Sequence, residues 1–466
     1  MVLKTEITIT IYTCLSSNIS VQTFMFKLLK RTSSLQILSI QSDPLTINRF
    51  LESNRQLSNC LINLKSPVTV GPTDVPFVEI PTQSCDLKQD EIHPTSILQL
   101  LEKIPKLKQL FLSLNPSGYS ALSELERFQE LRNFPLEQMK ILYRFKGNAN
   151  SSDLIKNITF PEALKTLGFY IDLDWKINLK SKLCDPCLKL FTRIQALPKL
   201  LELSCNVFTG DEIGENLAKI FFQNLPISLT KLECKLFKTD DMITNVNEVQ
   251  QIWSDLAKCE RLKEFTLKIF HKNYGFHSSP FSTTTSPIKG DEHVKLPSVE
   301  YFHITSMICH LDYDSIFSML DKEKLKGLQI YTSKDVEVID SKCLFAKLQD
   351  FTNLRCLYLE FIPIGEIDQS VYEAIRNYLL KSRHLQYLRL ILQITKCVDS
   401  IIISTQLMEI LRRKRKLKAA RIVAQVRGDC GHRERLNIAY ERDDRNAAII
   451  NDSWCKIERI ELKHRS

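Results

Sequence analysis

The sequence is short of the features that mark several protein classes. Only 12 of its 466 residues are glycine, which excludes collagen-like and glycine-rich low-complexity structure. No stretch reaches the roughly 18–20 apolar residues that span a bilayer. The phosphate loop G-x-x-x-x-G-K-[ST], the zinc motif H-E-x-x-H, the nucleophile elbow G-x-S-x-G and the protein-kinase motif set are also missing. We therefore expect a protein that is not an enzyme and that carries no cofactor.

The cysteines form no pattern of a disulfide framework or a metal site. Fourteen cysteines are scattered, mostly inside apolar segments, where a free thiol packs as a small hydrophobe. One Cys-x-x-Cys pair, Cys184 and Cys187, has no second pair at zinc-finger spacing, so no metal is expected. Within residues 1–20, Ile and Thr alternate from Ile7 to Ile11, which predicts a strand rather than a signal peptide. We therefore expect an intracellular protein, located in the cytoplasm rather than in the nucleus.

What the sequence does contain is enough apolar surface to fold. Hydrophobic residues make up 44% of the chain and charged residues 25%, as in ordinary globular proteins. The net charge of +9 is unevenly placed, because residues 401–466 hold 16 Lys and Arg against nine Asp and Glu. A basic run within this end extends from Arg412 to Lys418.

One short apolar pattern recurs along nearly the whole chain. It consists of an apolar residue, two variable positions, an apolar residue, one variable position and a third apolar residue. From Leu107 onward its first positions lie 26 to 40 residues apart. Thirteen such triplets begin at Leu35, Leu107, Leu136, Leu164, Leu200, Leu229, Leu262, Val299, Leu325, Leu354, Leu385, Leu417 and Ile457.

Helical patterns lie between the triplets. Apolar residues recur at i, i+3, i+4 and i+7 from Ile97 to Ile104 and from Val371 to Tyr378. Further helices are expected over 211–222, 249–256 and 405–411, and a helix is expected to start near Cys184 and Cys187. Each repeat is thus predicted to be a short strand followed by a returning helix.

The triplet, with its helices, resembles the leucine-rich repeat family, whose core is L-x-x-L-x-L followed by x-x-N or C. The spacing is similar to that of the ribonuclease-inhibitor-like subclass. The resemblance implies an α/β fold, a solenoid whose curved parallel sheet carries helices on its convex side. The family's asparagine, eight residues after the first Leu, is matched only by Asn115. An irregular solenoid over residues 1–466 is therefore expected, with helices or aromatic residues setting the register.

Two stretches interrupt the array, and its C-terminal end is basic. Residues 66–94 form a proline-rich insertion with five prolines. Residues 271–297 are rich in Ser, Thr and Pro and are expected to form a projecting loop. Residues 401–466 are expected to be basic C-terminal repeats.

Between the apolar positions, side chains should point to the concave face, since strand residues alternate. Tyrosine and arginine are enriched in binding hot spots, although tyrosine also favours strands in general. Six residues are accordingly predicted to form an exposed partner-binding surface: Tyr301, His303, Tyr331, Tyr358, Tyr387 and Arg389.

The basic run comprises Arg412, Arg413, Lys414, Arg415, Lys416 and Lys418. Three interpretations remain open for it. Cations stabilise the C-terminal end of a helix, a Lys- and Arg-rich segment can act as a nuclear import signal, and such a segment can contact the phosphates of RNA or DNA.

The sequence therefore favours a monomeric, non-catalytic scaffold that binds a protein partner of unknown identity on its concave face. A first alternative is the substrate-recognition subunit of a ubiquitin ligase, a role that the family resemblance implies, although residues 1–60 contain no recognisable F-box. A second is an RNA- or DNA-associated factor that uses the basic C-terminal end. A protein partner is favoured over nucleic acid, and no membrane partner is expected.

Overall fold

The computed structural model describes sixteen stretches of the chain: 8–12, 37–41, 68–70, 109–114, 127–145, 155, 158–173, 184–209, 212–238, 246–271, 294–306, 312–332, 341–367, 369–397, 400–426 and 433–441. The chain divides into two compact units, unit 1 (Met1–Lys324) and unit 2 (Leu325–Ser466), each of which is considered by itself. No helix among the described residues is both long and apolar enough to cross a membrane.

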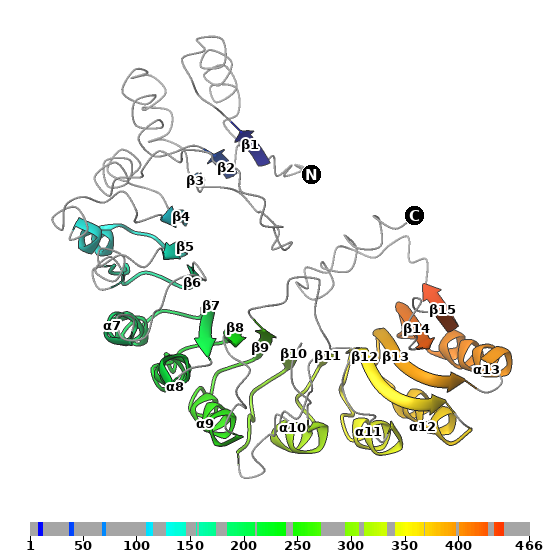
Figure 1. The fold of residues 1–466 in the computed structure, drawn as a ribbon. Helices are drawn as coiled ribbons and strands as arrows, with labels where there is room; N and C mark the ends of the chain where they lie inside the picture. Colours follow the sequence, from blue (N-terminus) through cyan, green and yellow to red (C-terminus); the bar gives the residue numbers. More distant parts are fainter. Residues whose placement is uncertain are drawn as a thin grey trace. The chain divides into compact units, whose positions relative to one another are not determined.

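Unit 1 contains a sheet of seven parallel strands that follow one another in chain order (Figure 1). A second, three-stranded parallel sheet precedes it and consists of β1 (Thr8–Tyr12), β2 (Ile37–Gln41) and β3 (Val68–Val70). The seven strands are β4 (Gln109–Leu114), β5 (Gln138–Phe145), β6 (Thr166–Leu173), β7 (Glu202–Thr209), β8 (Lys231–Lys238), β9 (Glu264–His271) and β10 (Tyr301–Ser306).

The helices of unit 1 connect these strands and cover one face of the sheet (Figure 1). Asp312 caps the last of them, because its carboxylate accepts hydrogen bonds from the backbone N–H groups of Asp314 and Ser315. The helices of unit 1 are the 3-10 helix η2 (Arg127–Asn133) and the α-helices α7 (Cys184–Gln195), α8 (Glu212–Gln223), α9 (Val246–Ala257) and α10 (Tyr313–Met319).

Unit 2 repeats the same arrangement, and two of its strands, β12 and β13, are longer than the strands of unit 1. Its parallel strands are β11 (Gly327–Thr332), β12 (Cys356–Ile367), β13 (Tyr387–Cys397) and β14 (Ala419–Val426). The helices between them are α11 (Ser341–Leu348), α12 (Gln369–Lys381) and α13 (Ser400–Arg413), on one side of the sheet (Figure 1). In both units, the sheet face without described helices is called the open face.

The final described strand, β15 (Arg433–Glu441), departs from the repeat because it pairs antiparallel with β14. Only residues 427–432 separate the two strands. A parallel connection needs a crossover of a dozen residues or more, whereas an antiparallel partner can follow a short loop. The six residues between β14 and β15 are too few for a returning helix, which accounts for the antiparallel pairing.

The apolar triplets build the core of both units. In every triplet from Leu35 to Leu417, the second and third positions lie within a strand. Leu232 and Cys234 on β8, and Leu357 and Leu359 on β12, are 1% exposed or less. A strand and helix bury their apolar faces only by stacking on the next repeat. The predicted α/β leucine-rich-repeat architecture, alternating strands and helices with one parallel strand per repeat, is thus confirmed.

A backbone hydrogen-bond pattern holds successive repeats in register. The carbonyl just before one strand accepts hydrogen bonds from two consecutive N–H groups of the next repeat. The N–H groups of Leu201 and Glu202, for example, both donate to the Lys165 carbonyl, at 2.8 and 3.0 Å. The same carbonyl role is taken by Glu137, Lys165, Leu201, Thr230 and Lys263 in unit 1 and by Lys326, Arg355 and Gln386 in unit 2.

Several expected features fall outside the described residues: the helix over 97–104, residues 272–293 of the Ser/Thr/Pro-rich loop, and the triplet that begins at Ile457. Of the proline-rich stretch 66–94, the structure describes only β3. The other expected helices are present, and α13 is longer than predicted at both ends.

Candidate functional site

The open face of each unit is formed by the strand residues that alternate with the buried triplet positions. On β8, Leu232, Cys234 and Leu236 are buried, and Glu233 and Lys235 between them are half-buried on the opposite face. Because most strands continue two or more residues past the triplet, each contributes a second open-face residue. Polar side chains thus follow one another from strand to strand.

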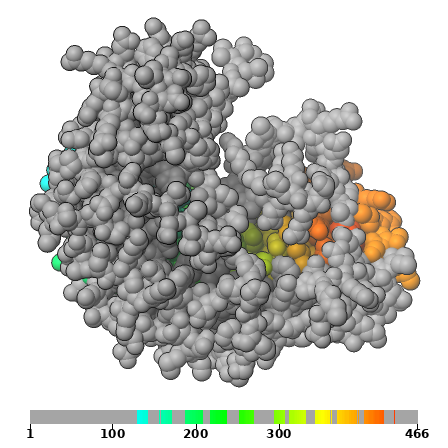
Figure 2. Space-filling view, turned by 45° about the horizontal axis from the view of Figure 1, so that its top comes forward, coloured from blue at the N-terminus to red at the C-terminus, as the bar shows by residue number. Residues whose placement is uncertain are grey.

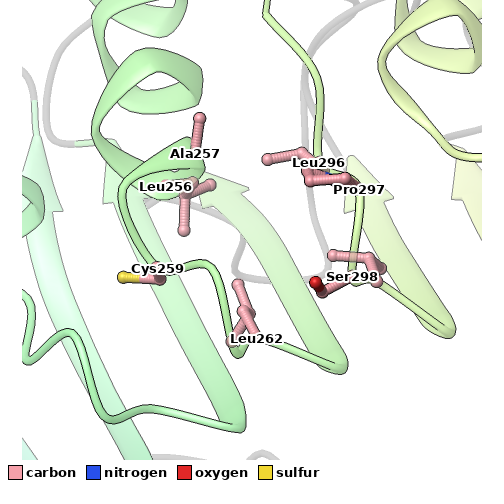
Figure 3. A pocket seen from close by; sticks show the side chains of 8 residues that line it. Leu256, Ala257, Cys259, Leu262, Leu296, Pro297 and Ser298 are labelled. Carbon is pink, nitrogen blue, oxygen red and sulfur yellow. The ribbon is translucent and has the colours of Figure 1, made fainter.

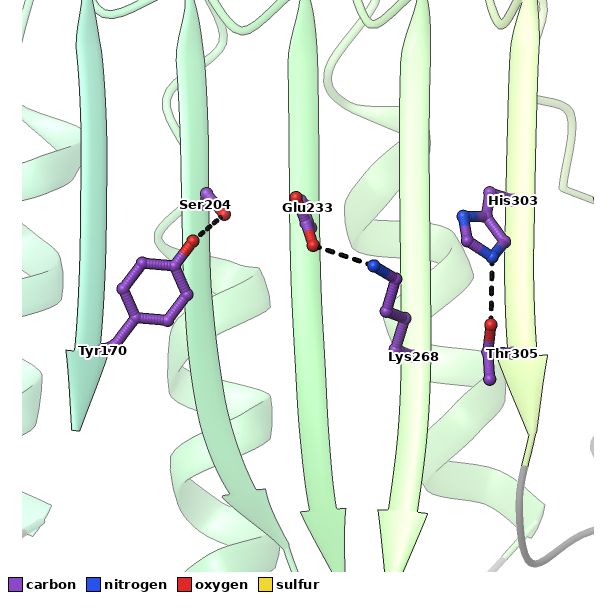
Figure 4. A network of polar contacts seen from close by, with 6 residues as sticks. All are labelled: Tyr170, Ser204, Glu233, Lys268, His303 and Thr305. Atoms are coloured by element: carbon purple, nitrogen blue, oxygen red, sulfur yellow. Dashed lines mark hydrogen bonds and ion pairs between the residues drawn. The ribbon is translucent and has the colours of Figure 1, made fainter. Parts of the chain in front are cut away.

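Tyr170 on β6 is the centre of the polar contacts at one end of this row (Figure 4). Its hydroxyl shares a hydrogen bond with the Ser204 hydroxyl on β7. The ammonium groups of Lys140 and Lys235 each lie 5.7 Å from the centre of its ring, within the range of cation–π attraction. Burial raises the pKa of Tyr170 to about 12, so this hydroxyl stays protonated at neutral pH.

Gly168 on β6 makes room for this arrangement. A Cβ atom at this position would stand 3.0 Å from Cγ of Lys140 and 3.3 Å from Cε2 of Tyr170. A larger residue would therefore push at least one of these two side chains aside.

Glu233 on β8 and Lys268 on β9 form an ion pair at 3.1 Å between Oε1 and Nζ (Figure 4). Burial alone would raise the pKa of Glu233, but the charges of Lys268 and Lys235 outweigh it and lower that pKa. Burial also lowers the pKa of Lys235, against the attraction of Glu233. One carboxylate is thus held between two ammonium groups.

His303 on β10 lies beyond this ion pair and bonds to Thr305 on the same strand (Figure 4). Its Nε2 and the Thr305 hydroxyl are 2.9 Å apart. Burial and, to a smaller extent, the nearby positive charge of Lys268 together lower the pKa of His303 to about 3, against the opposing effect of Glu233. The imidazole is therefore neutral at neutral pH and serves as a polar contact, not as a charge.

This protonation state predicts a pH effect on stability. An exposed histidine in the unfolded chain takes up a proton near pH 6.5, whereas folded His303 does so near pH 3. Between these two pH values the unfolded state binds more protons than the folded state. The contribution of the neutral ring to the free energy of unfolding is therefore complete above about pH 6.5 and decreases as the pH falls below that value. In NMR spectra, we expect the His303 ring signals to keep their neutral-form shifts from pH 8 to pH 5.

The ring signals of His303 are identified as those that disappear in the variant His303→Gln. The free energy of unfolding of this variant should also decrease less between pH 6.5 and 5 than that of the wild type. A midpoint of the His303 ring shifts near pH 6.5 would contradict the buried neutral imidazole.

The open face of unit 2 carries four of the six predicted partner-binding residues. Tyr331 lies on β11, Tyr358 on β12, and Tyr387 and Arg389 on β13. The strand register places Tyr358 directly beside Arg389. Tyr331 and Tyr387 are half-buried, and the Lys418 ammonium group lies 5.7 Å from the centre of the Tyr387 ring.

Tyr358 is not exposed as the sequence predicted. Its side chain is only 3% exposed. Gln329 on β11 and Arg389 on β13 stand at the same level of the sheet, about 5 Å away on either side. An alternation argument assigns a face to a strand residue but does not include the neighbours that flank it, and here large neighbours fill both sides.

Arg389 is engaged within the sheet. Its Nε lies 3.2 Å from Oε1 of Glu360 on β12, and the two side chains are 18% and 13% exposed. A pair that is this shielded from water cannot lose one partner without leaving the other charge poorly solvated. Arg389 therefore has a structural part in unit 2 besides any contact that it makes with a partner.

The other two predicted residues, Tyr301 and His303, lie on β10 of unit 1. Both are half-buried, and the backbone N–H of Tyr301 donates to the Lys263 carbonyl at 2.9 Å. These two residues belong to the polar row of unit 1, and the remaining four belong to unit 2.

The six residues of the basic run extend from the last turn of α13 to the start of β14. Arg412, Arg413, Arg415 and Lys416 are exposed, and Lys414 and Lys418 are half-buried. Arg413 pairs with Glu409 one turn earlier. The Lys414 ammonium group donates to the Ser382 carbonyl at 2.7 Å, and burial lowers the pKa of Lys414.

Apart from Tyr331, sequence reasoning missed the open-face residues that directly follow the last apolar position of the triplet. The alternation that identified the first open-face residue of each strand continues beyond the triplet, and this signal was available in the sequence. What it could not show is that the strands are long enough to use it. The missed residues are Tyr170, Lys235, Lys268, Thr305 and Glu360.

A small pocket lies in unit 1 between the loop after α9 and the segment before β10 (Figure 3). Its walls are mainly apolar side chains, among them Leu256, Leu262 and Leu296, together with Cys259 and Ser298. The residues that line this pocket include no acidic or basic side chain that could assist Cys259 or Ser298 in catalysis. Across the described stretches of chain, no three His, Cys, Asp or Glu residues are grouped so that they could hold a metal ion.

No protein-family model matches the chain, and no curated protein matches it. Among solved structures, the chain is similar to one in the crystal structure of the Rad7 and Elc1 complex in yeast. The TM-score is 0.38 and the sequence identity is 14%, with 82% of this chain and 84% of that chain covered. The surfaces of this chain itself must therefore carry any proposal about its function.

Proposed function

We propose that the protein is a non-catalytic scaffold that binds a protein partner on the open face of unit 2. Tyr331 and Tyr387 are half-buried there, so each has ring surface left for a partner to cover. Large aromatic side chains next to charged groups are the residue types that dominate protein interfaces. A preformed sheet loses little conformational freedom on binding, which favours affinity.

The single observation that carries this proposal is the placement of Tyr387 among small neighbours. The register puts Cys356 of β12 and Ala419 of β14 on either side of it. Neither neighbour is as tall as the tyrosine ring, in contrast to the flanked Tyr358. The Lys418 ammonium group lies beside its ring, and Arg389 is two residues further along the same strand.

We also propose that the repeats are an irregular form of the ribonuclease-inhibitor-like subclass. The helix after most strands of the described repeats supports this assignment, as does the 26 to 40 residue spacing of the triplets. The subclass asparagine is absent from most repeats, and the paired N–H groups that share one carbonyl take over its task of joining neighbouring repeats.

The double variant Tyr331→Ala and Tyr387→Ala tests the proposed surface. Two hot-spot residues lost together should weaken partner binding by more than about 30-fold. We expect partners that co-purify with the tagged wild-type chain, identified by mass spectrometry after RNase treatment, to be lost from this variant. The matched control Leu380→Ala and Ile402→Ala removes two exposed apolar side chains from α12 and α13, on the helix side.

Partners that stay bound to the tyrosine variant but not to the control variant would contradict the proposed surface. The recovered proteins also separate the alternatives. Components of a ubiquitin ligase among them would assign the chain to substrate recognition within such a complex. The loss of every partner after RNase treatment would favour the nucleic-acid alternative over the protein scaffold.

A further inference from the structure

Positive charge is concentrated on two successive loops of unit 2 and the helix ends before them, and a third, neighbouring loop adds one arginine. Each loop leads into a strand. Residues 349–355, 381–386 and 412–418 together contain nine Lys and Arg and a single acidic residue, Asp350. We use the name basic rim for six of these cations: Arg355, Arg383, Arg412, Arg415, Lys416 and Lys418.

Backbone and side-chain bonds hold these loops side by side. The N–H of Lys418 donates to the Gln386 carbonyl at 2.8 Å, and the N–H of Gln386 donates to the Arg355 carbonyl at 2.7 Å. One step further from the strands, Nζ of Lys416 lies 3.1 Å from Nδ1 of His384. Neighbouring loops are thus about one strand spacing, roughly 5 Å, apart.

This register brings arginines of adjacent repeats next to one another. Arg415 directly precedes Lys416, and Arg383 directly precedes His384, so the two arginines occupy equivalent places in adjacent loops. Like charges at such neighbouring positions repel each other. Both side chains are exposed, so an anion from solution can reach them.

The helix end explains only part of this charge. Arg412 and Arg413 lie in the last turn of α13, where the helix dipole favours cations, and Arg413 pairs with Glu409. Arg383, Arg415 and Lys416 lie in loops outside any helix. The orange segment that holds α13 and the residues after it reaches the molecular surface (Figure 2).

From this arrangement we propose that the basic rim binds the phosphate backbone of a nucleic acid. Phosphate binding requires little besides cations, and guanidinium groups match phosphate oxygens with paired hydrogen bonds. A protein partner would need an apolar core at the interface. The exposed large apolar side chains of the described part of unit 2 are Leu380 and Ile402, and both belong to helices, not to the rim loops.

The test is salt-dependent binding of a fluorescent 20-nucleotide single-stranded RNA to the full-length chain, followed by anisotropy. Contact with three phosphates predicts roughly a 20-fold loss of affinity between 50 and 200 mM salt. The variant Arg383→Gln, Arg415→Gln and Lys416→Gln should lower the slope of log affinity against log salt by about 2. Its affinity at 50 mM salt should fall at least about 10-fold.

The control Lys189→Gln, Lys199→Gln and Lys219→Gln removes the same net charge from exposed positions in unit 1. It should bind RNA within twofold of the wild type. Circular dichroism shows whether each triple variant is folded. If the triple rim variant does not fold, the single variant Arg415→Gln takes its place and should lower the slope of log affinity against log salt by about 0.7.

A wild-type affinity that is flat between 50 and 200 mM salt would overturn the proposal, as would equal losses in the rim and control variants. Tighter binding of poly-glutamate than of RNA would overturn it in favour of an acidic protein segment. The single variant Tyr331→Ala of the open face should bind RNA like the wild type, because the register places Tyr331 beside Glu360 and not beside a rim residue. The RNA site and the protein-binding surface can therefore be contradicted independently of each other.

Discussion

Replacing Trp253 with alanine is expected to lower the free energy of unfolding of unit 1 by about 3–5 kcal/mol. Trp253 on α9 is completely buried. Its ring centre lies 6.1 Å from that of Phe265 on β9 and 6.4 Å from that of Phe302 on β10. These two rings also contact each other at 5.8 Å. One side chain thus joins a helix to two successive repeats, and its removal leaves a cavity that none of them can fill alone.

Urea denaturation, followed by circular dichroism, measures this loss. The control Ile227→Ala removes an apolar side chain that is 76% exposed, and its effect should stay within about 0.5 kcal/mol. A loss below about 1 kcal/mol for Trp253→Ala would show that the aromatic cluster does not hold α9 to its sheet.

In unit 2, Leu357→Ala should cost about 2–5 kcal/mol. Leu357 is the second triplet residue of β12 and is completely buried. The register places it between Leu328 on β11 and Leu388 on β13, which are 0% and 3% exposed. The vacated volume lies between two strands whose spacing is fixed by backbone hydrogen bonds, so the site cannot collapse around it.

The same substitution at an exposed leucine provides a matched control. Leu380 on α12 is 51% exposed, so Leu380→Ala removes the same atoms with little loss of packing. Thermal melts should separate the two variants by several degrees. Equal melting temperatures would mean that the triplet does not identify the core, and the repeat assignment would fail in unit 2.

The triplet was a reliable guide because it depends on one physical requirement. Each short strand must bury its second and third apolar residues against the neighbouring repeats, and only a few residue types satisfy that need. The strands from β2 to β14 with triplets and the helices α8, α9, α12 and α13 were predictable for this reason. Helix limits were less so, since α13 starts five residues before the predicted Thr405.

The open faces were predictable only in part. Alternation assigns Tyr358 and Arg389 to the correct side of the sheet, but the burial of Tyr358 depends on side chains from neighbouring strands. Pairings such as Arg389 with Glu360 also depend on register between strands about thirty residues apart. A pattern within one strand holds no information on that register.

The antiparallel strand β15 was missed for a related reason. Residues 433–441 contain several charged residues and no apolar triplet, so the sequence pattern did not predict a strand there. Their pairing with β14 follows from the six-residue loop before them, which permits an antiparallel partner. The repeated triplet identifies only the parallel strands of the repeats and therefore gives no indication of an antiparallel strand after a short connection.

The carbonyl groups that each accept two N–H groups have a consequence for how freely the sequence can change. Because these bonds are made by main-chain atoms, the side chains at the donor positions can be of almost any type. In unit 1 they include Lys165, Thr166, Leu201, Glu202 and Thr230. Proline is the residue that cannot donate there, since it has no N–H group. Mutational tolerance at the joints between repeats should therefore be broad, with proline as its sharp exception.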